Sequence, residues 1–193
     1  EADLIDLVGN FQLNGWRSTA FVSDGDIRLQ GVQVLAIKPV PTFGDGSLTS
    51  SGDLSFTSSQ LYPATLTHYL LNVFGAPDAA ISFTRKGGDA TDVYSVGGEL
   101  TVRAPVIHQQ GVVRAPMGTI ALEAGRSLTL DSNSLTSTSL EGVTAPFGKV
   151  ELGKDWVYQL SQQTRIPSRL VFTEQTNRAA DVFPSSLVKL VGP

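Results

Sequence analysis

A short pattern of hydrophobic and polar positions recurs along the chain. Each copy is a glycine, a polar residue and an apolar–polar–apolar triplet, as in Gly25–Leu29 (GDIRL). Further copies lie at Gly52–Phe56, Gly98–Val102 and Gly118–Leu122, with a looser one at Ala80–Phe83. Because successive side chains of a β-strand point to opposite faces, each triplet predicts a short strand with one buried face. The glycine predicts a corner, reached through a positive φ angle or a close approach of two backbones.

The spacing of these copies predicts a solenoid. The copies recur at intervals of roughly 20 to 27 residues, which lies within the range of periods found in repeat architectures. In such architectures each unit buries its apolar face against its neighbours. The intervals are counted on the first apolar residues of the copies, which are Ile27, Leu54, Ile81, Leu100 and Ile120.

Residues 98–140 indicate how many strands form one coil. Three apolar segments are followed there by three more in the same order. The matched pairs, each separated by one coil, are Leu100 with Ile120, Ile107 with Leu128, and Val113 with Leu135. Stacking of such coils would place parallel strands above one another around an apolar column. We therefore predict a single all-β domain over residues 1–193, a three-sided parallel solenoid; the alternative fold is a β-sandwich, whose neighbouring strands would be antiparallel.

Two regions depart from the repeat. Residues 39–51 (PVPTFGDGSLTSS) predict a protruding loop. From residue 154 to residue 193 the pattern is less regular, although Asp155–Tyr158 and Arg169–Phe172 read as strands. We interpret this C-terminal part as a cap or as a docking segment for a further module.

Composition and charge narrow the class of protein. The chain has no cysteine, which excludes disulfides, thiolate metal sites and a cysteine nucleophile, and which suits a chain exported in an unfolded state. Its net charge is −4 without a basic run, so nucleic acid is not an expected partner. No apolar run approaches the length of about 20 residues that spans a bilayer. Because the sequence opens without a methionine or an export signal, we expect it to be excised from a larger protein.

The sequence predicts no catalytic residue, metal or cofactor. Its two histidines, His68 and His108, are far apart in the sequence and have no cysteine or second histidine at ligand spacing. A nucleophile elbow, a phosphate-binding loop and a helical zinc motif are all missing. Asp24, Asp26 and Asp45 border glycines, but no calcium-binding loop surrounds them.

A polysaccharide-active β-helix enzyme is a rival interpretation, because such solenoids can carry carboxylates in a groove along one face. Asp53, Asp131 and Glu151 are not separated by multiples of one coil, and the pattern assigns the acids to corners rather than to a stack. This distribution argues against an enzyme.

Aromatic residues are the candidate binding residues. In Asp155–Tyr158 the alternation places Trp156 and Tyr158 on one face of a strand, where they could stack on a sugar if that face is outward. Trp16, Tyr62 and Tyr94 are further candidates. For each of them the competing interpretation is a structural role in packing.

One block of sequence carries a family resemblance. Residues 104–119 (APVIHQQGVVRAPMGT) resemble a domain of filamentous-haemagglutinin-type large exoproteins. The resemblance extends to GDLSF at Gly52–Phe56 with QLYP at Gln60–Pro63, and to PFG at Pro146–Gly148 with DWVY at Asp155–Tyr158.

The resemblance implies a right-handed β-helix within a long rod, exported by two-partner secretion through an outer-membrane partner to the surface of a Gram-negative cell. It implies adhesion, biofilm formation or the stalk of a delivered toxin as functions, and it brings no catalytic residues. We therefore expect a structural or adhesive segment of a secreted surface protein, with a glycan-recognition module as the alternative function. Its partners would be neighbouring coils or domains of the parent and a surface glycan or receptor.

Overall fold

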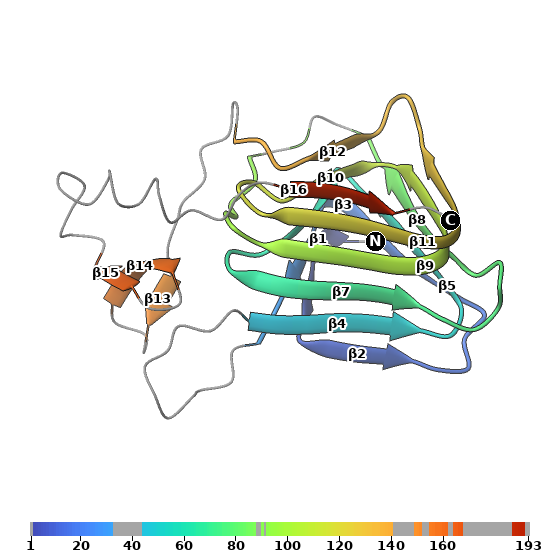
Figure 1. Ribbon diagram of the computed structural model, residues 1–193, viewed down its shortest axis with the longest axis horizontal. Coiled ribbons are helices and arrows are strands. Elements are labelled where there is room, and N and C mark those ends of the chain that lie inside the picture. Colours follow the sequence, from blue (N-terminus) through green and yellow to red (C-terminus); the bar gives the residue numbers. More distant parts are fainter. Residues whose placement is uncertain are drawn as a thin grey trace.

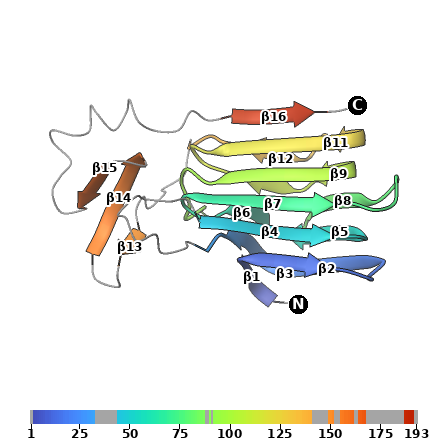
Figure 2. The same ribbon diagram turned by 60° about the horizontal axis from the view of Figure 1, so that its bottom comes forward.

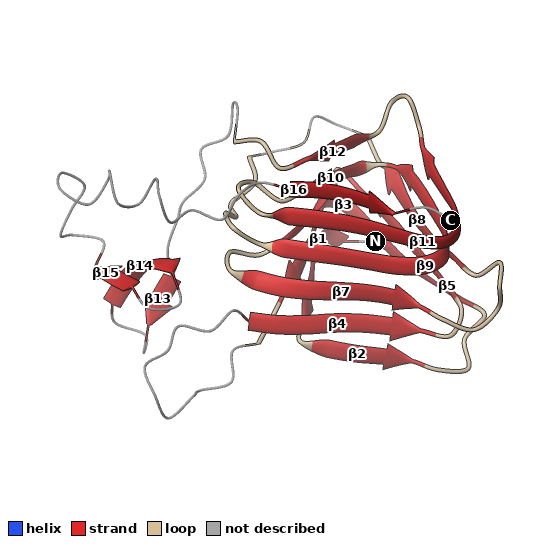
Figure 3. Cartoon of the chain, in the orientation of Figure 1, coloured by secondary structure: helices blue, strands red, loops and turns tan. Residues whose placement is uncertain are grey.

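The computed structural model describes residues 2–32, 44–87, 90, 92–140, 149–151, 155–161, 164–167 and 187–191. All regular elements among these residues are β-strands (Figure 3). The strands are β1 (Ala2–Val8), β2 (Asn10–Leu13), β3 (Ser18–Gln30), β4 (Gly44–Ser50), β5 (Asp53–Ser58), β6 (Gln60–Pro63), β7 (Thr67–Val73), β8 (Ala80–Arg85), β9 (Glu99–Gln110), β10 (Val112–Arg114), β11 (Thr119–Leu130), β12 (Leu135–Ser137), β13 (Lys149–Glu151), β14 (Asp155–Ser161), β15 (Thr164–Pro167) and β16 (Leu187–Val191).

Parallel pairing arranges most of these strands in three ladders. Ladder 1 stacks β2, β4, β7, the first half of β9, the first half of β11 and β16, which lie side by side in Figures 1 and 2. Ladder 2 stacks the first half of β3 with β5, β8 and the second halves of β9 and β11. Ladder 3 stacks β1, the second half of β3, β6, β10 and β12. The chain visits the ladders in turn, so the fold is all-β, parallel and solenoid-like.

The core lies between the three ladders. In ladder 1, Leu48, Leu71, Val102 and Leu122 occupy successive paired positions and are at most 1% exposed. The residues that follow them in sequence point outward and are polar, as the two-residue period of a strand requires. This column begins at Phe11, 38% exposed, and ends at Leu190, 47% exposed.

The core of ladder 2 contains a stack of aromatic rings. Phe21, Phe56 and Phe83 occupy paired positions in β3, β5 and β8, with ring centroids 5.3 and 5.5 Å apart and nearly parallel planes. The next position in this column is Gln109, which is fully buried. Its amide Nε2 donates to the carbonyl of Leu135 at 3.1 Å, and its Oε1 accepts from the Gly111 backbone at 3.1 Å. The buried amide thereby satisfies backbone groups at the corner after β9.

The predicted stacking of coils is confirmed for two of the three matched pairs. Leu100 pairs with Ile120, and Ile107 pairs with Leu128. The third match is wrong by one position, because Leu135 pairs with Val112 and Val113 pairs with Thr136. The parallel pairing excludes the β-sandwich.

The order of the repeat copies along the chain does not follow any single ladder. Leu54 and Ile81 are paired across ladder 2, as their spacing suggests. Ile27, however, pairs with Leu61 of ladder 3, and Ile81 pairs with Ile107. The Gly–polar–apolar signature therefore marks strands of all three ladders, and the coil length cannot be read from successive copies.

The glycines that begin the repeat copies are needed for space and not for backbone angle. Gly25, Gly52, Gly98 and Gly118 are not among the residues with positive φ. A Cβ atom on Gly118 would collide with the carbonyl oxygen of Gly98, one coil earlier. Of the two predicted explanations, close approach of stacked backbones is the correct one.

The loop predicted over residues 39–51 is corrected in its second half. Residues 44–50 form β4, which pairs with β2 and with β7 inside ladder 1. A Cβ on Gly46 of this strand would lie 2.5 and 2.6 Å from ring atoms of Tyr69, so the glycine makes room for a buried ring. The first half of the predicted loop falls in residues 33–43, outside the described residues.

The short strands of the C-terminal part that the structure describes pair in another way. β13, β14 and β15 form a small antiparallel sheet, with Trp156 opposite Val150 and Tyr158 opposite Ile166. β16 then adds to ladder 1 beside β11. The strand predicted at Arg169–Phe172 falls outside the described residues.

Candidate functional site

The outer surface of ladder 1 carries stacked polar side chains. Two columns of outward residues run across its strands at coil spacing, about 4.8 Å from strand to strand. The His68 column consists of Asp45, His68 and Glu99. The Arg103 column consists of Gln12, Thr49, Asn72, Arg103 and Glu123. Together they form a polar surface held by the rigid strands beneath.

The His68 column places an imidazole between two carboxylates. His68 Nδ1 lies 3.3 Å from Asp45 Oδ1, and His68 Nε2 lies 3.4 Å from Glu99 Oε2. Both ring nitrogens thus face a carboxylate, one from the strand before and one from the strand after. The three groups tie three successive strands together, and neither nitrogen points freely toward solvent as a general base would.

This column corrects the expectation that the acids lie at corners and are not stacked. Asp45, His68 and Glu99 are separated by unequal lengths of chain, which no constant repeat length would bring together. Asp45 also belongs to the segment that was predicted as a loop. The sequence signal that could have found the column is the shared alternation of the three strands, which gives each of these residues an outward position next to a buried one.

The other candidate acids serve local structure. Asp53 Oδ1 accepts a hydrogen bond from the Ala80 backbone at 2.9 Å, and Asp131 Oδ1 accepts one from the Asn133 backbone at 2.9 Å. Lys86 Nζ lies 2.6 Å from Asp24 and, by hydrogen bonding and then by charge, holds the pKa of Asp24 below its usual value. The side chain of Glu151 lies outside the described residues.

The two histidines of the chain lie on different outer surfaces of the solenoid. His108 points outward from ladder 2, in a column with Ser82 and Thr129, whereas His68 belongs to ladder 1. In the part of the chain that the structure describes, no group of three or more histidine, aspartate and glutamate side chains is arranged to hold a metal ion. Asp26, the last of the calcium candidates, accepts a hydrogen bond from Gln60 Nε2 at 3.1 Å instead.

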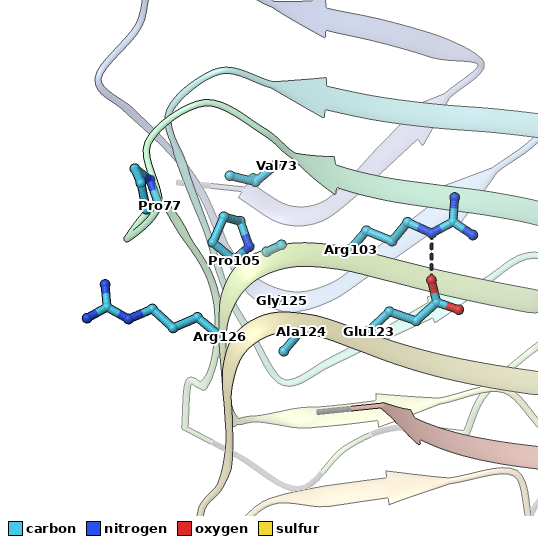
Figure 4. A pocket seen from close by; sticks show the side chains of 9 residues that line it. Val73, Pro77, Arg103, Pro105, Glu123, Ala124, Gly125 and Arg126 are labelled. Atoms are coloured by element: carbon cyan, nitrogen blue, oxygen red, sulfur yellow. Dashed lines mark hydrogen bonds and ion pairs between the residues drawn. The ribbon is translucent and has the colours of Figure 1, made fainter. Parts of the chain in front are cut away.

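An open concavity of about 580 Å³ lies where ladder 1 meets ladder 2 (Figure 4). It exists because the corners differ in length: six residues separate β7 from β8, while β9 turns the same corner at Pro105 alone. The long corner carries Pro77 outward as a wall. The floor is apolar and is made by Val73, Ala104, Pro105 and Ala124, with Gly125 beside them.

Two arginines border this concavity. Arg103 belongs to the Arg103 column, and its Nε donates to Glu123 Oε2 at 2.6 Å. Arg126 lies on the other side and points away from the ladder (Figure 4). A bulge directs it there, because Gly125 and Arg126 together oppose the single residue Pro105 of β9.

The predicted aromatic candidates are spread over the molecule. Trp16 and Tyr94 are 66% and 61% exposed, whereas Tyr62 is 3% exposed, and burial followed by the Asp26 carboxylate raises the pKa of Tyr62 to about 12. Trp156 and Tyr158 lie two residues apart on β14. Their side chains lie outside the described residues, and the sugar-stacking role stays a prediction.

Comparisons with known proteins identify no relative. No family model, no curated protein and no solved structure matches the chain. Among the described residues, no helix could cross a membrane.

Proposed function

We propose that this chain is a structural and adhesive segment of a secreted bacterial surface protein, built as a right-handed, three-sided parallel β-helix. In this proposal it forms part of a rod of the filamentous-haemagglutinin type, in which neighbouring coils or domains of the parent stack on it. An outer-membrane partner would export the parent to the exterior of a Gram-negative cell. The function is then mechanical: the segment holds other parts of the protein at a distance from the cell.

One observation carries the proposal, namely that the three parallel ladders share a single apolar core and turn polar residues outward. Columns such as Leu48, Leu71 and Val102 are completely buried from strand to strand. Solenoids of this kind gain stability additively from neighbouring coils, so they form extended and rigid bodies. The stacked outer pairs, among them Asp6 with Arg28 at 2.6 Å, add links between coils on the outside.

A replacement experiment separates a structural role from recognition. The parent protein is expressed in its own cells in three forms: intact, without residues 1–193, and with these residues replaced by an unrelated parallel β-helix of matching length. If the segment is structural, the protein is found outside the cell, accessible to added protease, and the replacement retains the adhesion that the deletion loses. Loss of adhesion in the replacement, or an intracellular protein, would contradict the proposal.

A glycan-recognition module is the second candidate function, and the observation that favours it is the small antiparallel sheet outside the ladders. β14 contains Trp156 and Tyr158 two residues apart, a spacing that in a strand favours one shared face, and paired aromatic faces are suited to stacking on sugars. A glycan-array screen of the purified chain tests this function, run beside Trp156→Ala and Tyr158→Ala. Trp16→Ala is the matched control, because Trp16 is also an indole, is exposed, and lies near the other end of the chain. Binding that is lost only in the first two variants would establish recognition, and an absence of binding would remove this candidate.

A further inference from the structure

We propose that the concavity between ladders 1 and 2 binds an acidic sugar of the hexuronic type through its carboxylate. This ligand site goes beyond a structural role, and the two can be tested independently. Three features of the concavity point to this class of ligand: the exposed guanidinium group of Arg126 at its edge, its apolar floor and its polar surroundings.

The guanidinium groups have donors to spare. Arg126 is exposed and has no hydrogen-bond or ion-pair partner among the described residues. Arg103 is bonded to Glu123 through Nε, and its two terminal amino groups make no hydrogen bond within the described part of the chain. A guanidinium carries five N–H donors in a planar fork that fits a carboxylate with two parallel bonds. The chain as a whole is acidic, with a net charge of −4, whereas the concavity is bordered by two arginines and one glutamate, which leaves an excess of one positive charge at the corner.

The floor between the arginines selects against small inorganic anions. The rings of Pro77 and Pro105 are the more exposed apolar groups of the lining, and the aliphatic side chains of Val73, Ala104 and Ala124, at most 6% exposed, complete it. A phosphate or sulfate ion has no apolar part to place there. A pyranose ring has a face of C–H groups that can lie on aliphatic and prolyl carbons, while its carboxylate reaches Arg126 at the edge of the concavity.

The polar surroundings match the remaining groups of a sugar. Asn72 and Thr49 precede Arg103 in the same outward column, about 4.8 Å apart from strand to strand. They offer an amide and a hydroxyl group to the hydroxyls of adjoining sugar residues. The concavity is open to solvent rather than enclosed, so it suits one residue within a longer chain. Its volume of about 580 Å³ lies in the range of small-ligand sites.

Two substitutions test the site without disturbing the core. Arg126→Gln removes the exposed cation and keeps a polar side chain of similar length. Gly125→Leu fills the floor; a Cβ at this position has Pro105 Cα at 3.8 Å as its nearest neighbour, which is an ordinary contact, and Gly125 has no positive φ. Arg114→Gln is the matched control, because it removes the same charge from β10 of ladder 3.

Calorimetric titration of the purified chain with oligogalacturonate, and with the same oligomer carrying methyl-esterified carboxyl groups, measures the binding. We expect saturable binding of the acid form, no detectable binding of the ester, and affinity at least tenfold weaker in Arg126→Gln and Gly125→Leu. Arg114→Gln should bind as the unmodified chain does, and circular dichroism should be the same for all variants.

Three results would overturn the proposal. They are the absence of saturable binding to the acid form, equal binding of the ester, and equal weakening by Arg114→Gln and Arg126→Gln, which would indicate general charge attraction. None of these results would affect the structural role, which the replacement experiment decides separately.

Discussion

Gly46 and Tyr69 provide a direct test of how the coils stack. They occupy paired positions in β4 and β7, within an inward column that continues through Leu100 and Ile120. Tyr69 is 2% exposed, and burial raises the pKa of its phenol. Its ring occupies the space where a side chain on residue 46 would begin. The perturbation is therefore Gly46→Ala, made both in the natural chain and in a chain with Tyr69→Leu.

The expected magnitude follows from the contact distances. A Cβ at residue 46 would lie 2.5 Å from Cε2 and 2.6 Å from Cδ2 of Tyr69, much closer than ordinary carbon contacts. Overpacking of this kind costs about 1 to 3 kcal/mol. Replacing glycine by alanine in a strand recovers about 0.5 to 1 kcal/mol from the entropy of the unfolded chain. Gly46→Ala should therefore lower the free energy of unfolding by about 1 to 2 kcal/mol with Tyr69 present, and should raise it slightly when Tyr69→Leu has removed the ring.

Urea denaturation followed by circular dichroism measures these free energies in a double-mutant cycle. Gly125→Ala is the control, because an added Cβ there meets only an ordinary contact and should change stability by less than about 0.5 kcal/mol. An equal loss for Gly46→Ala in both backgrounds would contradict this explanation, since the cost would then come from the backbone and not from the ring of Tyr69.

Three other predictions concern stability. The folded-state pKa of Tyr62 is raised from 10.0 to about 12, so its contribution is complete below pH 10 and is lost as the pH rises to about 12. Tyr62→Phe should therefore reduce the loss of stability in alkaline unfolding curves by about 2 to 3 kcal/mol, whereas Tyr94→Phe should leave that loss unchanged. Part of the loss should remain in Tyr62→Phe, because the pKa of the buried Tyr69 is raised as well. Phe56→Leu should lower the free energy of unfolding in urea by about 1 to 3 kcal/mol, because it breaks two ring stacks. Phe21→Leu should lower it less, because it breaks one stack at a partly exposed position. Equal losses would contradict the contribution of stacking. His68→Asn should change the free energy of unfolding in urea by less than about 1 kcal/mol, because the imidazole is 41% exposed and exposed ion pairs contribute little. A larger loss would contradict this and would give the His68 column a greater role in stability.

The alternation of apolar and polar residues was sufficient to predict β5, β8 and parts of β3, β9 and β11, although the segment of β4 was predicted as a loop. Buried positions at Leu54, Ile81, Leu100 and Ile120 follow from a period of two, which depends only on the geometry of a single strand. The register between Leu100 and Ile120 was also predictable, because β9 and β11 have the same length and follow one another in successive coils. Where neighbouring coils differ in length, as before Leu61 and Ile107, the register could not be predicted from spacing.

The candidate site could be predicted only in part. The sequence singled out Trp156 and Tyr158 from their alternation; both lie in β14, and their shared face stays a prediction. The concavity beside Arg126 was not foreseen, because it results from a difference between two corners and from a bulge of one residue. Neither feature has a signature within its own segment of sequence.

Local alternation along the chain was enough to establish that this protein is made of short strands with one apolar face, because that information lies within each strand and repeats. Only the folded chain shows which strands are neighbours. It therefore also decides that Asp45, His68 and Glu99 form a stack and that Gly46 pairs with Tyr69. A solenoid fixes contacts by coil position and not by distance along the chain. Corners of unequal length change that distance without disturbing the ladders, so residues at very different separations in sequence meet equally well.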